Sequence, residues 1–316
     1  MNPVIERCLR AGTRSDTIET VAQWWPRWKA VAAAGDSPVA LAIGCGFAAD
    51  RVAWAFAAGY QAALRALAPE LPADALVAFC VTEESGNRPR DMQTVITHHD
   101  DGSVSISGAK RWTTLGPDCT LLLVVGRELD AADDRDARPK LRVACVASAA
   151  PGLSLVAMPP TRFVPEVPHA RVYLAGVRLP ASALLPGDGY DAFVKPFRTL
   201  EDTHVTAAAL AYLLREACAR AWPASLRERI VSTLCALAAV AAGASDSPAS
   251  HVALEGALRW AHHLYDEAAP LWEAAADEAA ARWQRDAPLF AVAGAARVQR
   301  AGRAWERLAS EGEMHG

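Results

Sequence analysis

The sequence changes its hydrophobic periodicity twice, and this segregation limits the folds open to the chain. From about Ser15 to Ala68, apolar residues recur at helical spacing, as in DRVAWAFAAGYQAALRAL. From Leu76 to about Leu185, short apolar runs and alternating stretches such as QTVITHH and SVSISG are typical of strands. From Tyr190 onward the helical spacing returns. Because helices and strands occupy separate blocks, the sequence predicts an α+β fold and not alternating α/β units.

The three blocks predict three domains. A helical N-terminal domain is expected over 1–75, a strand-built domain over 76–188 and a C-terminal helical bundle over 189–316. Pro69 and Pro72 interrupt the helical pattern at the end of the first block. The segment Asp100-Asp101-Gly102, between two alternating stretches, predicts a hairpin turn. The charged segment 128–140 is expected to form a surface loop.

The charge and the apolar runs argue against several kinds of partner. The net charge is −4, so no basic field is available to hold nucleic acid or anionic lipid. The longest apolar run, Leu234 to Ala242, is too short to span a bilayer. The start of the chain lacks the apolar core of a secretory signal. Seven scattered cysteines without a C-x-x-C pair suit reduced thiols, so a cytoplasmic location is expected.

Two common cofactor-binding and catalytic motifs are missing from the sequence. No G-x-G-x-x-G opens a helix after a strand, so a Rossmann-type nicotinamide site is not supported. No G-x-S-x-G occurs, which argues against a hydrolase. His262 with Asp266, and His263 with Glu267, have a spacing that can ligate a metal. Ordinary side-chain pairs along one helix explain the same spacing, so no metal site is expected.

The segment ISGAKRWTTLGPDC, Ile106 to Cys119, sets an indole and two hydroxyls between two apolar runs. One interpretation is a hairpin with a packed tryptophan. The other is one wall of a flavin site, because a flat redox ring needs a flat apolar surface and fixed hydrogen-bond partners. This segment alone leaves both interpretations open.

Four motifs, in order along the chain, carry a family resemblance. They are Phe79 to Ser85, close to the start of a T-E-P-x-x-G-S-D segment; Ser107 to Gly116, close to N-G-x-K-x-[WF]-I-[TS]-N-G; Pro151-Gly152-Leu153; and Val177 to Pro180 followed by Leu184 to Gly189. In these motifs the chain resembles a divergent, shortened member of the acyl-CoA dehydrogenase family. The resemblance implies a helical N-terminal region, a small central β-barrel and a C-terminal helical bundle.

The resemblance implies roles for four residues of the central domain. Val81 and Thr82 would give backbone and hydroxyl hydrogen bonds to the polar edge of a flavin ring. Trp112 would lie against the face of the ring, and Thr114 would bond near its reactive nitrogen. The expected cofactor is FAD.

The chain also departs from the family pattern. The family proline is Glu84, and the Gly-Ser-Asp is replaced by Asn87-Arg88-Pro89. Arg88 then points to solvent, pairs with a phosphate, or blocks the site; we take it as a candidate substrate-binding residue. The F-G pair and the glutamine that hold the dinucleotide diphosphate in the family are also missing after the barrel.

The base that such a reaction needs is not where most of the family has it. The corresponding segment, Leu289 to Ala295, contains no carboxylate. A minority of the family places the base at the start of the first helix after the barrel, which points to Glu201. The alternative is that Thr199 or Asp202 caps this helix and that the acids merely favour its positive end.

Two functions follow from the resemblance. The first is an FAD-dependent oxidoreductase acting on a CH–CH bond of an acyl-CoA or related thioester, with a separate electron acceptor. The second is a catalytically degenerate relative that keeps the fold as a binding or scaffolding subunit. For either, the family implies a homo-oligomer, a dimer or a tetramer.

Overall fold

A computed structural model describes residues 3–13, 16–129 and 139–313. Most of the charged segment 128–140 lies outside the described residues, so its expected loop stays a prediction. The chain forms two compact units, each assembled from separate stretches. The helical unit comprises Met1–Pro69, Thr161–Glu166 and Arg198–Gly316, and the sheet unit comprises Glu70–Pro160 and Val167–Phe197.

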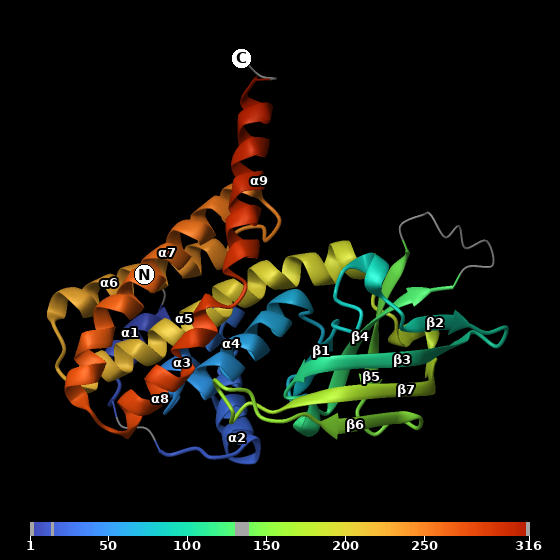
Figure 1. The fold of residues 1–316 in the computed structure, drawn as a ribbon, viewed down its shortest axis with the longest axis horizontal. Coiled ribbons are helices and arrows are strands. Elements are labelled where there is room, and N and C mark those ends of the chain that lie inside the picture. The colour runs from blue at the N-terminus through green and yellow to red at the C-terminus, as the bar shows by residue number, and fades with distance from the viewer. Residues whose placement is uncertain (1–2, 14–15, 130–138, 314–316) are drawn as a thin grey trace. The chain divides into compact units, whose positions relative to one another are not determined.

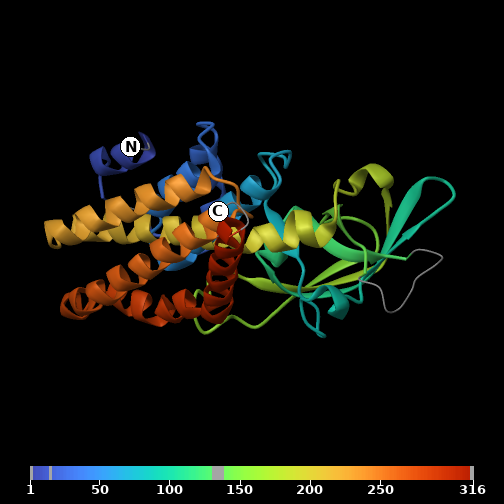
Figure 2. The ribbon, with the colours of Figure 1, turned by 90° about the horizontal axis from the view of Figure 1, so that it is seen from above.

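The helices account for nearly all of the helical unit (Figure 1). They are α1 Pro3–Arg10, α2 Val21–Ala32, α3 Pro38–Ala48, α4 Val52–Leu67, α5 Lys195–Ala219 (within this unit from Arg198), α6 Ala224–Ala241, α7 Pro248–Ala275, α8 Glu278–Asp286 and α9 Gly294–Glu313. A short 3₁₀ turn, Ala287–Ala291, precedes α9. The turn between α6 and α7 folds these two long helices back on one another, and they lie side by side (Figure 2).

Two glycines let α3 and α4 approach the backbone of α5. A Cβ atom built on Gly46 would lie 2.6 Å from Cα of Ala208. One built on Gly59 would lie 2.5 Å from Cα of Val205. No real Cβ atom approaches backbone atoms this closely, so only glycine fits these two positions. Most residues of α4 are buried, and many of them are alanines, whose small side chains allow neighbouring elements to pack closely.

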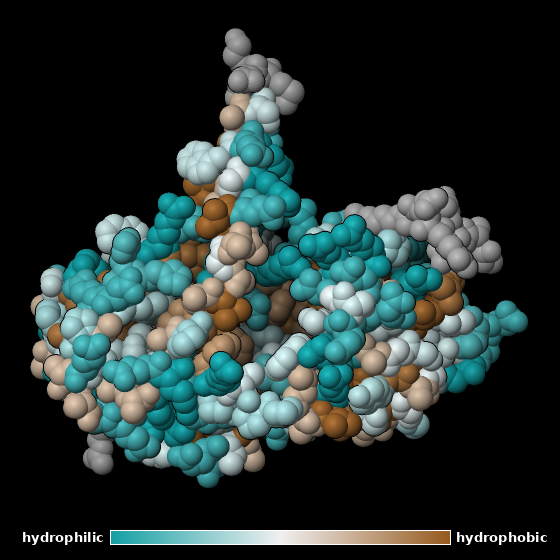
Figure 3. Space-filling view, in the orientation of Figure 1, coloured by the Kyte–Doolittle hydropathy of each residue, from teal (hydrophilic) through white to brown (hydrophobic). Residues whose placement is uncertain are grey.

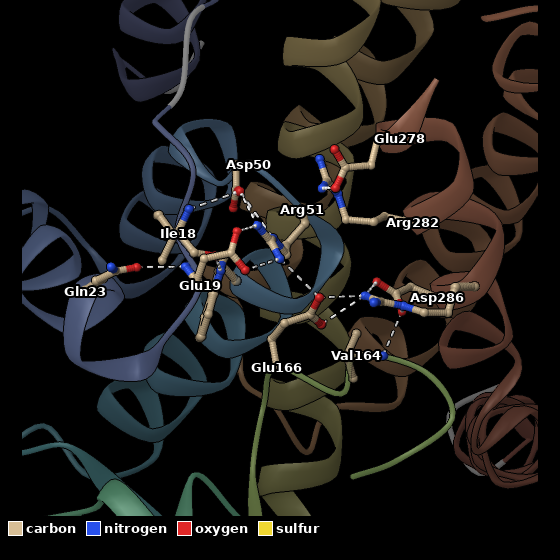
Figure 4. A network of polar contacts seen from close by, with 12 residues as sticks. Ile18, Glu19, Gln23, Asp50, Arg51, Val164, Glu166, Glu278, Arg282 and Asp286 are labelled. Atoms are coloured by element: carbon tan, nitrogen blue, oxygen red, sulfur yellow. Dashed lines mark hydrogen bonds and ion pairs between the residues drawn. The ribbon is translucent and has the colours of Figure 1, made fainter. Parts of the chain in front are cut away.

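A chain of ion pairs around the buried Arg51 joins distant segments of the helical unit (Figure 4). Arg51, at the start of α4, lies 2.8 Å from Asp50, 2.9 Å from Glu19 and 3.2 Å from Glu166. The carboxylate of Glu166 also lies 2.9 Å from Arg285 of α8. This network ties the short stretch Thr161–Glu166 to helices from both ends of the chain.

The same stretch contains a backbone outlier. Val164 has a φ of +45°, a region that β-branched residues rarely adopt. Its N–H donates a 2.7 Å hydrogen bond to the buried carboxylate of Asp286. The surrounding bonds therefore hold Val164 in a conformation that it would not choose alone.

The described residues of the sheet unit form seven strands: β1 Val77–Cys80, β2 Val95–His98, β3 Ser103–Thr114, β4 Leu121–Glu128, β5 Leu141–Ala147, β6 Leu153–Ala157 and β7 His169–Pro180. Their order is β1-β4-β2-β3-β7-β6, with β5 paired to β4. The expected hairpin is present: β2 and β3 pair antiparallel, and Gly102 has a φ of +78° in the turn. Alternating residues of the strands form the core, among them Ile96, Ile106 and Val124.

The α+β fold predicted from the sequence is confirmed, with a curled sheet between two helical blocks of the sequence. The division into three domains at residues 75 and 188 stays a prediction. All seven cysteines are free thiols, and burial raises the pKa of Cys80 to about 12. No helix in the described ranges combines the length and apolarity that crossing a membrane requires.

Gly46→Ala tests the close approach of α3 to α5. We expect the free energy of unfolding to fall by about 1–3 kcal/mol, because the added methyl group meets backbone that cannot move aside alone. Gly256→Ala in α7 is the matched control, because its added Cβ meets nothing within 4 Å. The control should stabilise by roughly 0.5–1 kcal/mol. Urea unfolding followed by far-UV circular dichroism measures both, and equal stabilities of the two variants would contradict the packing.

Candidate functional site

Trp112 lies at a bulge in β3 of the sheet unit. Lys110 pairs with Val172 of β7, but Thr113 pairs with Ala170, so two residues of β3 oppose one of β7. Trp112 has a φ of +56°, and 45% of the residue's surface is exposed. A bulky residue with this φ is a backbone outlier of the kind that clusters at functional sites. The indole is therefore presented outward and is not a core side chain.

Two basic or aromatic neighbours orient the exposed indole. The ring of His169 lies edge-on at 6.0 Å between centroids, and burial lowers the pKa of this histidine. The guanidinium carbon of Arg111 lies 5.3 Å from the centre of the indole. The indole thus contacts His169 and Arg111, while much of its surface stays accessible to solvent.

The other predicted flavin contacts lie on the same part of the sheet unit. Val81 and Thr82 follow the last residue of β1, and the N–H of Arg111 donates a 2.9 Å hydrogen bond to the carbonyl of Thr82. Thr114 is the last residue of β3. Val81, Thr82 and Thr114 are all half-buried. Among the residues that the structure describes, neither threonine hydroxyl has a hydrogen-bond partner, so both are available to a ligand.

Beneath these groups lies a buried ion pair that the sequence analysis missed. Nζ of Lys110 lies 2.6 Å from Oε1 of Glu83, and both side chains are almost fully buried. Burial lowers the pKa of Lys110 to about 8, against the opposing charge of Glu83. The alternation of β3 held the signal, because Val104, Ile106 and Lys110 are all buried on its core face.

Arg88 lies in the segment between β1 and β2, just before the short 3₁₀ turn Pro89–Asp91. Its side chain is exposed, and its backbone N–H donates a 3.3 Å hydrogen bond to Asp91. Of the three possibilities, the structure has the solvent-facing one. A role for Arg88 in binding substrate stays a prediction.

Glu201 lies in the second turn of α5, in the helical unit. The alternative that Thr199 or Asp202 caps this helix is wrong. The helix continues from a π-helical turn, Gly189–Val194, whose cap is Asp188; its carboxylate accepts hydrogen bonds from the N–H groups of Tyr190 and Asp191. The positive end of the helix dipole is therefore remote from Glu201, and its effect fades within the first turn.

The environment of Glu201 shifts its proton affinity. Burial raises the pKa of Glu201 to about 7, the charge of Asp202 adds to the increase, and Arg297 and Arg198 oppose it. The side chain keeps partial access to solvent. Within the described ranges its carboxylate has no hydrogen-bond partner. An unpaired carboxylate with a pKa near neutrality has the properties of a general base.

Two arginines of α9 form ion pairs with Asp202, the residue after Glu201. Asp202 lies 2.8 Å from Arg297 and 2.9 Å from Arg300. Arg297 also donates a 3.0 Å hydrogen bond to the carbonyl of Phe290, in the segment that contains no carboxylate. This contact brings the late segment and the second turn of α5 together, and the sequence analysis did not anticipate it.

Nearby histidines have structural partners. His204 donates from Nδ1 to the carbonyl of Leu200 at 2.7 Å, and burial lowers its pKa to about 4. His262 and His263 contact aromatic rings, those of Tyr265 and Trp260. In the part of the chain that the structure covers, no three His, Cys, Asp or Glu side chains gather as a metal site would require.

Comparison with known proteins identifies the fold. The structure of butyryl-CoA dehydrogenase from Megasphaera elsdenii matches with a TM-score of 0.67 at 16% identity, over 84% of this chain and 81% of that chain. Glutaryl-CoA dehydrogenase from Mycobacterium smegmatis, in complex with FADH2, matches with a TM-score of 0.66 at 16% identity, over 96% and 90%. FMN-bound TdsC from Paenibacillus sp. A11-2 matches with a TM-score of 0.61 at 18% identity, over 88% and 83%.

No protein-family model matches the chain, and no curated protein matches it significantly. The solved structures are too distant in sequence to carry more than the fold. Their agreement over most of both chains, together with the ordered motifs, is sufficient for that. The chain therefore has the acyl-CoA dehydrogenase fold, in a divergent form.

Proposed function

We propose that the protein is a flavin-dependent oxidoreductase that binds FAD and oxidises a CH–CH bond of an acyl thioester. The observation that carries the proposal is the exposed, backbone-strained Trp112, together with the hydroxyls of Thr82 and Thr114, which have no hydrogen-bond partner among the described residues. Flat apolar surface with adjacent donors and acceptors fits an isoalloxazine ring. The similar structures that hold FADH2 or FMN support the choice of a flavin.

Four residues would hold the ring. Trp112 would stack against it, the hydroxyl of Thr82 with the backbone of Val81 would bond its polar edge, and the hydroxyl of Thr114 would bond near its reactive nitrogen. When bound, the flavin accepts the hydride that leaves the β-carbon of the substrate. Exposed Arg88 would attract an anionic group of the thioester, such as a phosphate. A separate electron acceptor must then take the electrons.

Glu201 would remove the α-proton. Its carboxylate accepts that proton as the β-hydride leaves, so that a carbon–carbon double bond forms. A base acts best when its pKa lies near the working pH, and burial brings Glu201 into that range. Asp202 pairs with Arg297 and Arg300, whereas Glu201 has no such partner in the part of the chain that the structure describes.

A second function remains a candidate because of the late segment. Leu289 to Ala295 lacks the carboxylate, and the arginine next to it is engaged by Asp202 and Phe290. A non-catalytic subunit that keeps the fold for binding would have this feature. Flavin binding and the effect of Glu201 substitutions separate the two functions. The cytoplasmic location also stays a prediction.

Flavin binding is the first test. We expect the protein to retain FAD after incubation and desalting, seen as a visible absorption band. Trp112→Ala should weaken binding about tenfold, the effect of losing roughly 1.4 kcal/mol of stacking. Trp260→Ala is the matched control, because Trp260 is also exposed but belongs to the helical unit. Equal affinity of both variants would contradict the role of Trp112, and no band in any sample would favour the binding subunit.

Glu201→Gln tests the base. Wild-type turnover should rise with pH up to about 7 and then level off, because only the ionised carboxylate accepts a proton. The variant should lose at least about a hundredfold in turnover, the contribution typical of a general base. Glu228→Gln, on the exposed face of α6, should change little. A fully active Glu201→Gln protein would exclude the assignment.

The same variant has a readout without substrate. The folded-state pKa of Glu201, about 7, exceeds its ordinary value of 4.5, so the folded wild type binds the proton more tightly than the unfolded chain. The contribution of this carboxyl group to the free energy of unfolding is therefore complete at pH values below 4.5. It is lost as the pH rises from 4.5 to about 7. Glu201→Gln should therefore gain stability relative to wild type over that range, as measured by urea unfolding. A pH-independent difference would contradict the burial of this carboxylate.

We also infer a homo-oligomer, a dimer or a tetramer, built in part on α9. Val298 and Trp305 lie seven residues apart on one face of α9 and are 59% and 61% exposed. Figure 3 shows apolar side chains uncovered near the base of this helix. Exposed apolar surface of this kind commonly marks a protein interface.

Trp305→Glu should lower the molar mass in solution, because a charge at an apolar interface opposes association. Light scattering after size-exclusion chromatography measures the mass. Tyr173→Glu, at an exposed aromatic residue of β7, should leave the mass unchanged. A monomeric wild-type protein would exclude the oligomer.

A further inference from the structure

The buried ammonium of Lys110 occupies the core face of β3, two residues before Trp112. Only 2% of this residue is exposed. Nζ lies 2.6 Å from Oε1 of Glu83, 2.7 Å from the sulfur of Met92 and 3.4 Å from the carbonyl oxygen of Val81. A buried ammonium group thus contacts three segments that meet at the candidate flavin wall.

The carboxylate of Glu83 connects the two ends of the segment between β1 and β2. It accepts a 2.6 Å hydrogen bond from the N–H of Gln93 and a 3.0 Å one from the N–H of Thr94. Its backbone also exchanges two hydrogen bonds with Gly86. The residue directly after Thr82 is therefore fixed at both its backbone and its side chain.

Stability alone is a weak reason to bury such a pair. Apolar side chains of similar volume would fill the same space without the cost of removing two charges from water. The backbone at Trp112, however, adopts a conformation that persists only where neighbouring contacts enforce it. Lys110 lies two residues before Trp112, on the core face of β3, and bonds Glu83 and Val81 there. The N–H of Arg111, the residue directly before Trp112, donates a hydrogen bond to the carbonyl of Thr82.

We propose that Lys110 and Glu83 are positioning residues, which hold the Val81–Thr82 backbone and the Trp112 bulge in the geometry that a planar ligand requires. The inference rests on the proposed flavin function for the identity of that ligand. The positioning itself is a property of the free protein, so it is measured without any ligand.

The experiment removes both charges at once, with Lys110→Met and Glu83→Gln in one chain, so that neither is left unpaired in the core. Wild type and variant are labelled with 5-fluorotryptophan, and Trp112→Phe assigns the fluorine resonance of Trp112. Arg178→Met with Asp101→Asn is the matched control, because it removes an exposed ion pair of the same unit. FAD affinity is measured in parallel by titration.

We expect the double variant to fold with unchanged far-UV circular dichroism, but with a shifted or broadened Trp112 resonance and an FAD affinity at least tenfold weaker. The control pair should change neither. An unchanged Trp112 resonance in the folded double variant would overturn the positioning role. If the double variant fails to fold, Lys110→Arg decides in its place, because it keeps the cation but not its three contacts; an unchanged resonance there would also overturn the proposal.

The two measurements keep the proposals apart. If the wild type binds no FAD while the Trp112 resonance still responds to the double variant, the proposed flavin function fails and the positioning role stands. If FAD binds with equal affinity to wild type and double variant and the resonance is unchanged, the flavin function stands and the positioning role fails.

Discussion

The packing of the helical unit depends on the ion pairs that the guanidinium of Arg51 forms. This side chain is 4% exposed and lies within 3.2 Å of three carboxylates that come from separate parts of the sequence. Burial opposes its charge, but hydrogen bonds with Asp50 and Glu19 outweigh this effect and raise its pKa. Removing one partner of a buried ion pair typically lowers the free energy of unfolding by about 3–5 kcal/mol, because the remaining charge stays buried with neither an opposite charge nor water to stabilise it. Through Glu166 the network reaches Arg285 of α8, which also pairs with Asp286, the acceptor of the hydrogen bond from the strained Val164.

The residues of the candidate site rely on two different physical devices. In the sheet unit, a bulge and a positive φ expose an indole, and a buried ion pair lies beneath it. In the helical unit, burial and a neighbouring acid bring the pKa of a carboxylate to about 7. The first device provides a surface, and the second provides a proton acceptor. The proposed function assigns a separate role to each of these two arrangements.

Much of the fold could be predicted from local patterns. The blocks of helical and alternating spacing predicted the α+β class, and Asp101-Gly102 predicted the hairpin, because both are decided by residues close in sequence. The ordered motifs around Thr82 and Trp112 predicted the fold by resemblance. The pairing of Asp202 with Arg297 could not be foreseen, because the two are 95 residues apart and ordinary in composition. The helix cap was placed wrongly because the π-helical turn before Lys195 has no distinct apolar pattern.

The helical unit is assembled from three stretches that the sheet unit separates, and this order has a consequence for synthesis. The ribosome releases α3 and α4 before the whole sheet and well before α5. Gly46 of α3 and Gly59 of α4 pack against the backbone of α5. The apolar faces of α3 and α4 therefore stay uncovered until α5 has been synthesised. Uncovered apolar surface on a growing chain invites aggregation. The nascent chain is therefore expected to be a client of chaperones until Ala208 has emerged.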